Sequence, residues 1–154
     1  MSRRRDTHTL DLFDWTPPAV VERFDAQRVR AATWRDQIAR AVAEALHGSE
    51  LSREEIAERM NDFLGEEDGG VTRGILDNYA SQAKETHTIS FLRVIALGAV
   101  TGDARLLQLA ADPLERIVVE ARFEGAIKEA MATEQIEQLE RIKRLGRRQW
   151  RGAR

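Results

Sequence analysis

Apolar residues recur at intervals of three or four along most of this 154-residue chain, which is the period of an amphipathic helix. The clearest stretch begins at Ser52, which forms a capping-box signature with Glu55, while Leu51 and Ile56 are placed as a hydrophobic staple. A helix should begin there, with an inward face made of Ile56, Ala57, Met60, Phe63 and Leu64. The pattern as a whole predicts an all-α fold, a small helical bundle.

An acidic, glycine-containing turn separates this helix from a second one. Gly65 is a natural helix stop, residues 66–70 make the turn, and Thr72 is placed to cap a helix over residues 71–84. The inward side of that helix should be Ile75, Leu76, Tyr79, Ala80 and Ala83. Its outer side is polar and consists of Arg73, Asp77, Asn78, Ser81, Gln82 and Lys84. Residues 51–84 thus have the pattern of a helix-turn-helix with an enlarged turn, although helices of any α-helical domain can join in this way.

The segments on either side of this pair complete one helical domain over residues 17–114. Residues 18–46 have helical spacing, with Asp25 dividing a short helix from a long one and Trp34 at the edge of the core. Residues 89–100 are apolar almost all round, so that helix should lie at the centre of the bundle.

Capping signals mark the ends of this apolar helix. Thr88 or Ser90 can cap its start, Gly102 suits a left-handed position at its end, and Asp103 can cap the short helix that follows over residues 104–111. That short helix should bury Leu106, Leu107, Leu109 and Ala110.

Residues 1–16 form an N-terminal arm rather than part of the bundle. In the segment Leu10–Trp15, apolar and acidic side chains are interspersed, a pattern that suits an extended segment lying in a groove. The arm can pack on its own domain or serve as a contact for a protein partner.

Residues 115–154 form a C-terminal helix and a basic tail. The helix should continue to about Arg148, and its apolar residues make an imperfect stripe far from the core. Four of them, Ile136, Leu139, Ile142 and Leu145, are candidates for oligomerisation as a dimer or higher oligomer. Docking of the stripe back on the bundle is the alternative.

The formal net charge of −2 hides a separation of charge along the chain. Residues 141–154 hold seven basic residues and no acid, whereas the rest of the chain has 17 basic and 26 acidic residues, a balance of −9. Such a block either binds a polyanion, driven by counterion release, or only solubilises the chain. Phosphate contacts would come from Arg141, Lys143, Arg144, Arg147, Arg148 and Arg151.

The sequence offers little for catalysis or metal binding. It has no cysteine, and His8, His47 and His87 have no second histidine or carboxylate at ligand spacing. Residues 66–70 lack the ligand pattern of a calcium loop and the lysine of a phosphate-binding loop. We therefore expect no cofactor, no metal and no enzymatic activity. The longest apolar stretch, residues 94–100, is far too short to span a bilayer, so we expect a cytoplasmic protein without a membrane contact.

Residues 52–109 resemble a known family. In the temperate-phage regulatory proteins of the lambda cII-like family, a helix-turn-helix precedes an apolar helix, a threonine-glycine-aspartate step and a leucine-rich helix. Here those elements are residues 89–100, Thr101-Gly102-Asp103 and Arg105-Leu106-Leu107. The resemblance implies an oligomeric, sequence-specific DNA-binding transcriptional regulator with residues 71–84 as its recognition helix. This chain departs from the pattern in its acidic, enlarged turn and in the lack of a basic recognition face.

Two functions follow from these patterns. The first is a phage- or mobile-element-type regulator that reads double-stranded DNA, with Arg73, Asn78 and Gln82 as base contacts, Thr72 and Lys84 beside them, and the basic tail on phosphates. The alternative is a non-enzymatic adaptor, such as an assembly or anti-host factor, that binds a protein through its acidic face and the Leu10–Trp15 arm. A steep salt dependence of duplex binding is expected only of the first.

Overall fold

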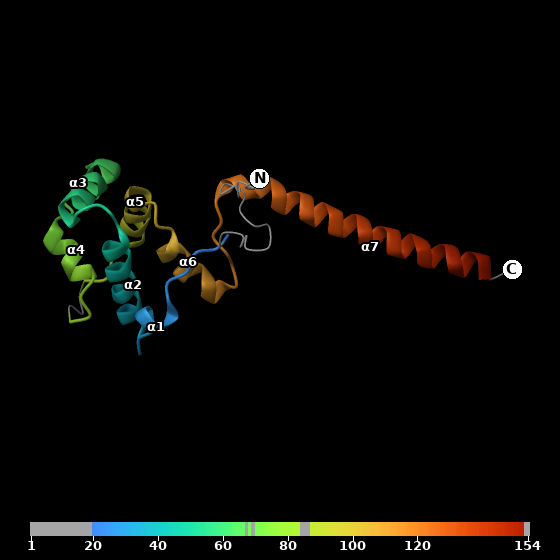
Figure 1. Cartoon of the computed structure of the whole chain (residues 1–154), viewed down its shortest axis with the longest axis horizontal. Helices are drawn as coiled ribbons and strands as arrows, with labels where there is room; N and C mark the ends of the chain where they lie inside the picture. The colour runs from blue at the N-terminus through green and yellow to red at the C-terminus, as the bar shows by residue number, and fades with distance from the viewer. Residues whose placement is uncertain (1–19, 67, 69, 84–86, 153–154) are drawn as a thin grey trace, which may run out of the picture. The chain divides into compact units, whose positions relative to one another are not determined.

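The computed structural model describes residues 20–66, 68, 70–83 and 87–152 and divides the chain into two units, residues 1–118 and 119–154. The described residues form helices and irregular segments without a strand, which confirms the predicted all-α class (Figure 1). The N-terminal arm and Lys84 lie outside the described residues.

The first unit is a bundle of short helices. In chain order these are α1 (Ala26–Val29), α2 (Trp34–Gly48), α3 (Arg53–Leu64), α4 (Arg73–Tyr79), α5 (Phe91–Thr101), α6 (Arg105–Ala111) and the 3-10 turn η1 (Asp112–Leu114). Helix α3 packs against α4 and α5, and α2 packs against α1, α4 and α6. Fully buried residues from four helices meet in one core: Val42, Ile56, Met60, Leu76 and Leu97. Helix α4 is therefore fixed to the bundle through Leu76.

Local capping signals set most helix boundaries as predicted. The capping box of α3 is present, since the Ser52 amide donates to the Glu55 carboxylate at 2.8 Å and the Glu55 amide donates to the Ser52 hydroxyl at 3.2 Å. Thr72 caps α4, Ser90 caps α5, and Gly102 takes a left-handed conformation with φ of 71° at the end of α5. These signals act within four residues, so they are readable without knowledge of tertiary contacts.

The prediction of helix from residue 18 was wrong for residues 20–25, and residues 18 and 19 lie outside the described part of the chain. Residues 22–25 are not helical, and the helix that Asp25 caps, α1, has only four residues before α2 starts after the cap Thr33. Phe24 is nevertheless buried, because the Arg105 guanidinium lies over its ring at 4.4 Å. A side chain of α6 therefore holds this irregular segment on the bundle.

The predicted central position of α5 was also only partly right. Ala96 and Leu97 are fully buried, but Phe91 is 68% exposed and Leu92 is exposed as well, because α5 packs mainly against α3 and α6. Other residues predicted to face inward are exposed: Phe63, Ala83 and Ala110. Trp34, predicted at the edge of the core, is 58% exposed. The apolar stripes are thus wider than the helix contacts that cover them.

The helix predicted over residues 71–84 is shorter. Helix α4 ends at Tyr79, where the Ser81 amide turns back to the Asn78 carbonyl at 3.2 Å. Glycine, asparagine and serine have low helix propensity, and Gly74, Asn78 and Ser81 all fall in this stretch. Gln82 consequently lies beyond the helix rather than on it.

The second unit contains the 3-10 turn η2 (Ala121–Phe123) and one long helix, α7 (Glu124–Gly152). Helix α7 has 29 residues, which corresponds to about 43 Å. None of its residues is buried, and Leu139 near its middle is 65% exposed. Its apolar side chains therefore have no cover within this unit.

Candidate nucleic-acid interface

Helix α4 presents a short polar face. Leu76 and Tyr79 point into the core, whereas Arg73 and Gly74 are exposed and Asp77 and Asn78 are partly exposed. The helix spans seven residues, or about 10 Å, and the Thr72 hydroxyl accepts the Ile75 amide at 3.3 Å to cap it. Two of the predicted base contacts, Arg73 and Asn78, thus lie on one helix, while Gln82 follows its end.

The turn before α4 is anchored by Asn61 of α3. Its side-chain amide donates to the Val71 carbonyl and its side-chain oxygen accepts the Val71 amide, both at 2.8 Å. Val71 is buried, so these bonds satisfy backbone groups that water does not reach. The end of the enlarged turn therefore has a defined position.

Arg93 of α5 holds the turn and α4 from the other side. Its guanidinium donates to both carboxylate oxygens of Asp68 at 3.1 Å, and to the hydroxyl of Tyr79. The Arg93 side chain is only 15% exposed. With Asn61, it holds α4 in one orientation relative to the turn.

Ion pairs occupy the charged side chains around α4. Arg73 donates to the Glu54 carboxylate at 2.6 Å and lies 3.7 Å from Asp77, which also accepts a bond from Arg53. The backbone amide of Glu54 and the Arg73 guanidinium hold the pKa of the Glu54 carboxyl below its usual range. The guanidinium of Arg73 is therefore already paired with acidic side chains. Its pair with Glu54 is exposed to water, however, where competing anions and salt weaken it.

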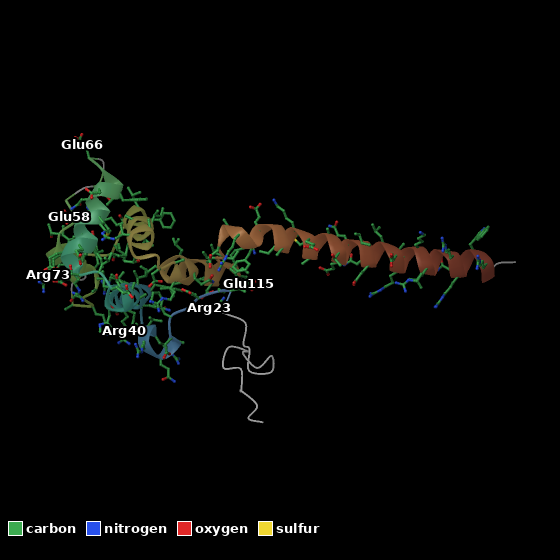
Figure 2. All side chains as sticks on the ribbon, turned by 45° about the horizontal axis from the view of Figure 1, so that its top comes forward. Arg23, Arg40, Glu58, Glu66, Arg73 and Glu115 are labelled. Carbon is green, nitrogen blue, oxygen red and sulfur yellow. The ribbon has the colours of Figure 1, made fainter. Side chains whose placement is uncertain are left out.

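The outer surface of α3 is acidic. Glu58 and Asp62 on α3 and Glu66 in the turn after it are exposed, and Figure 2 labels Glu58, Glu66 and, on α4, Arg73. These carboxylates repel phosphate, so duplex DNA would have to approach the α4 side.

Helix α7 carries the predicted phosphate contacts. All six of them are exposed, and at roughly 100° per residue four lie within about 60° of the side opposite Leu139: Arg141, Arg144, Arg148 and Arg151. Glu140 lies 3.8 Å from Arg144. The predicted oligomerisation residues do not form one straight stripe, since Leu145 lies about 120° around the helix from Leu139.

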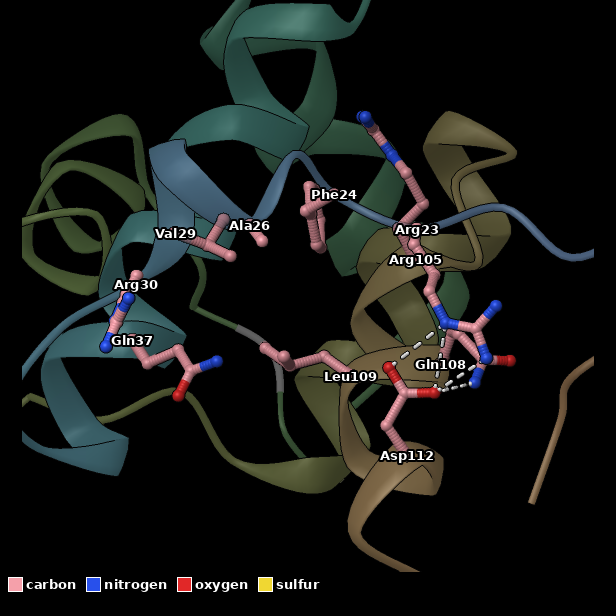
Figure 3. Close-up of a pocket in the computed structure, with 10 residues that line it drawn as sticks. All are labelled: Arg23, Phe24, Ala26, Val29, Arg30, Gln37, Arg105, Gln108, Leu109 and Asp112. Carbon is pink, nitrogen blue, oxygen red and sulfur yellow. Dashed lines mark hydrogen bonds and ion pairs between the residues drawn. The ribbon is translucent and has the colours of Figure 1, made fainter. Parts of the chain in front are cut away.

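Gln108 of α6 is 1% exposed and has a role that the sequence pattern did not predict. Its side-chain oxygen accepts the Val118 amide at 2.6 Å, and its nitrogen donates to Asp112 at 2.5 Å and to the Arg116 carbonyl at 3.2 Å. Gln108 and Asp112 line a hollow of about 230 Å³. Figure 3 shows both residues, with Arg23 paired to the same Asp112. Gln108 thereby ties residues 116–118 to the bundle, and no local signal marks it.

The residues of the threonine-glycine-aspartate step make hydrogen bonds that stabilise the connection between α5 and α6. The Thr101 hydroxyl donates to the Leu97 carbonyl at 2.7 Å, and the Asp103 carboxylate binds the Arg105 guanidinium at 2.7–3.1 Å while accepting the Arg105 amide at 2.9 Å. Arg105 in turn covers Phe24. These residues join α5, α6 and the start of the bundle.

A second surface feature is an apolar groove of about 200 Å³ between α2, α5 and α6. Trp34, Phe91 and Leu109 contribute to its walls, and the rest of the lining is Ile38, Ile89, Val94, Leu106 and Ala110. The groove holds no charged residue, so it fits apolar side chains rather than a nucleic acid.

The described residues contain no cluster of His, Cys, Asp or Glu side chains that could hold a metal ion. Among the helices that the structure describes, none combines the length and the apolar composition needed to cross a bilayer. No protein-family model matches the sequence, no curated protein is significantly similar to it, and no solved structure is significantly similar to its fold. Similarity to the lambda cII-like family therefore stays a prediction.

Proposed function

We propose that this protein is a non-enzymatic, homo-oligomeric transcriptional regulator of the phage or mobile-element type that binds double-stranded DNA. The observation that carries the proposal is the placement of Arg73 and Asn78 on the outer face of α4, which Asn61 and Arg93 hold in one orientation. Asn can bond bidentately to adenine and Arg to guanine, so these two side chains can read a short stretch of sequence.

The remaining binding energy would come from phosphates. The segment of α7 from Arg141 to Arg151 contains six basic residues and no acidic residue. Each phosphate that such residues neutralise releases counterions, which favours binding without regard to sequence. In this proposal α4 supplies selectivity and α7 supplies affinity.

The ion pair between Arg73 and Glu54 adds a condition to this proposal. Arg73 must leave Glu54 to reach a base edge, and the exchange is possible because both side chains are mostly exposed, at 63% and 59%. Removing the carboxylate should release Arg73 for DNA. The variant Glu54→Gln is thus expected to bind DNA more tightly than the natural sequence.

Selection of binding sites from random duplexes, followed by titration of the selected site, tests the proposal. Alanine at Arg73 and Asn78 together should lower affinity for the selected site to that for random duplex, with each residue contributing about 1–3 kcal/mol of discrimination. Arg59→Ala is the matched control, because it removes an exposed arginine from the neighbouring helix α3. Selection that yields no preferred site, or equal losses for Arg59→Ala, would contradict the proposal.

The adaptor function has one observation in its favour. The apolar groove beside Trp34 and Phe91, together with the acidic outer surface of α3, offers a surface that suits a protein rather than a phosphate backbone. An adaptor would bind duplex DNA without a steep salt dependence. A flat plot of affinity against salt concentration would therefore favour this alternative.

A further inference from the structure

Helix α7 has one face on which mostly uncharged side chains recur at spacings of three and four. Its middle members are Ala132, Gln135, Leu139, Ile142 and Gly146, and Lys128 and Trp150 continue it at the two ends. At about 100° per residue, all seven lie within roughly 60° of Leu139, a sector that also holds Glu124, Gly125, Ile136 and Lys143. We call this set the Leu139 face. Such spacing is typical of a helix that packs along another helix.

Two pairs of residues on the Leu139 face are placed symmetrically about its central residue. Ala132 and Gly146 lie seven residues before and after Leu139, and Lys128 and Trp150 lie eleven residues before and after it. A two-fold axis at Leu139 therefore brings unlike members of these pairs together. In an isologous contact between identical chains, residue i of one copy contacts residue j of the other, and j contacts i.

We propose that α7 pairs antiparallel with α7 of a second copy of this chain, centred on Leu139. In this arrangement Ala132 lies opposite Gly146 of the second copy, so the backbones can approach closely. Lys128 lies opposite Trp150, an arrangement that allows a cation–π contact. A parallel pair would instead place Lys128 beside Lys128, and Gly146 beside Gly146.

The charges beside the Leu139 face favour the same orientation. Glu129 and Arg147 both lie about 80° from Leu139 on the same flank, and the opposite flank at that angle has the uncharged Met131 and Gln149. In an antiparallel two-fold pair, like flanks meet, which brings Glu129 close to Arg147 of the second copy. In a parallel pair the charged flank meets the uncharged one.

One like-charge contact opposes this arrangement. Glu140 approaches its own symmetry mate across the two-fold axis, and Arg144, 3.8 Å from Glu140 in each helix, offsets that repulsion. The cations on the side opposite Leu139, including Arg148 and Arg151, stay clear of the contact and available to phosphate. The pairing rests on the proposed homo-oligomer and not on DNA binding.

Disulfide mapping tests both the pairing and its direction, because the natural sequence has no cysteine. Four single-cysteine variants of the full chain are needed: Gln135→Cys, Ile136→Cys, Ile142→Cys and Lys143→Cys. Antiparallel pairing brings position 136 close to 143 and position 135 close to 142. Parallel pairing brings 135 close to 136 and 142 close to 143. Mixtures of two differently tagged variants therefore distinguish the two.

We expect mixed disulfides for 136 with 143 and for 135 with 142, forming about tenfold faster than for 135 with 136 and for 142 with 143, because antiparallel pairing brings the first two pairs to disulfide distance and keeps the last two apart. Glu137→Cys mixed with Arg141→Cys is the matched control, since both positions point away from the Leu139 face. Faster reaction of 135 with 136 and of 142 with 143 would overturn the antiparallel direction. Reaction of every mixture at the control rate, with wild-type protein sedimenting as a monomer, would overturn the pairing.

All these measurements are made without DNA. A failure of the mapping would therefore leave DNA binding by α4 intact. Conversely, a protein that pairs as expected but selects no DNA site would retain the pairing and lose the proposed function.

Discussion

Asp103 shows how a single carboxylate can hold several elements. It accepts the backbone amide of Arg105 and clamps its guanidinium, which in turn covers Phe24. The Asp103 side chain is 13% exposed, so little water competes for it. Burial raises the pKa of this carboxyl, but the bonds from Arg105 lower it more, and the net result lies below the ordinary value of 3.8.

This depressed pKa predicts a pH dependence of stability. The charged form of Asp103 is favoured by folding, so its contribution is present above about pH 4 and is lost as the pH falls through the lowered pKa. Asp103→Asn should cost about 1–3 kcal/mol at neutral pH, because it removes a charge-assisted hydrogen bond. The difference from wild type should vanish in acid, as urea titrations at several pH values would show. A difference that stays constant with pH would contradict this account.

Gly74 lies in the middle of the outer face of α4, between Arg73 and Asn78. A Cβ there would meet nothing closer than the Thr72 hydroxyl oxygen at 3.9 Å, so the fold tolerates a side chain. Gly74→Leu should raise stability by roughly 0.5–1 kcal/mol through helix propensity. It should nevertheless abolish binding to the selected site, because the side chain projects between the helix and a groove.

The control for Gly74 is Gly125→Leu in α7, where a Cβ also has open space. That variant should leave affinity for the selected site unchanged. Gel-shift titration and thermal melting of both variants give the two readouts. Wild-type DNA affinity in Gly74→Leu would mean that the outer face of α4 does not approach DNA.

At the scale of the elements, the turn between α3 and α4 depends on one side chain. Asn61→Ala would leave both the amide and the carbonyl of the buried Val71 without partners. The expected cost is about 1–3 kcal/mol of unfolding free energy, measured by urea denaturation. Asn78→Ala, which removes the same side chain from the outer face of α4, should change stability by no more than about 0.5 kcal/mol. Equal effects of the two variants would mean that Asn61 does not anchor the turn.

The same pair of helices shows what sequence can and cannot predict. The caps at Ser52 and Thr72 were predictable because donor and acceptor are three residues apart. The bonds from Arg93 to Asp68 and from Arg73 to Glu54 join residues 25 and 19 positions apart, so they depend on how the helices pack. Both the pairing of Arg73 with Glu54 and the early end of α4 depend on this packing. The candidate residues could thus be named, but not their partners.

At the scale of the whole chain, the buried core and the proposed phosphate contacts lie in different segments. All buried residues of the described chain lie between Phe24 and Gln108. Truncation after Leu139 should therefore leave the melting temperature of the helical domain unchanged. It should weaken binding to every duplex alike, with the salt slope falling by roughly 0.9 for each phosphate that the tail no longer neutralises. Unchanged affinity of the truncated protein for random DNA would exclude the tail as the anchor.

The complete exposure of α7 also has a consequence for its own helix–coil equilibrium. With no residue buried in its unit, α7 is supported by local contacts such as the Glu124–Lys128 pair at 2.5 Å, and isolated helices in water are only marginally stable. At dilutions where α7 is not paired with a second copy, its helicity should decline gradually with warming, well before the cooperative melting of the bundle, and far-ultraviolet circular dichroism would separate the two. Because a free helix of this kind re-forms in about 0.1–1 μs, each binding event can order it on contact, at a cost in conformational entropy that grows with temperature.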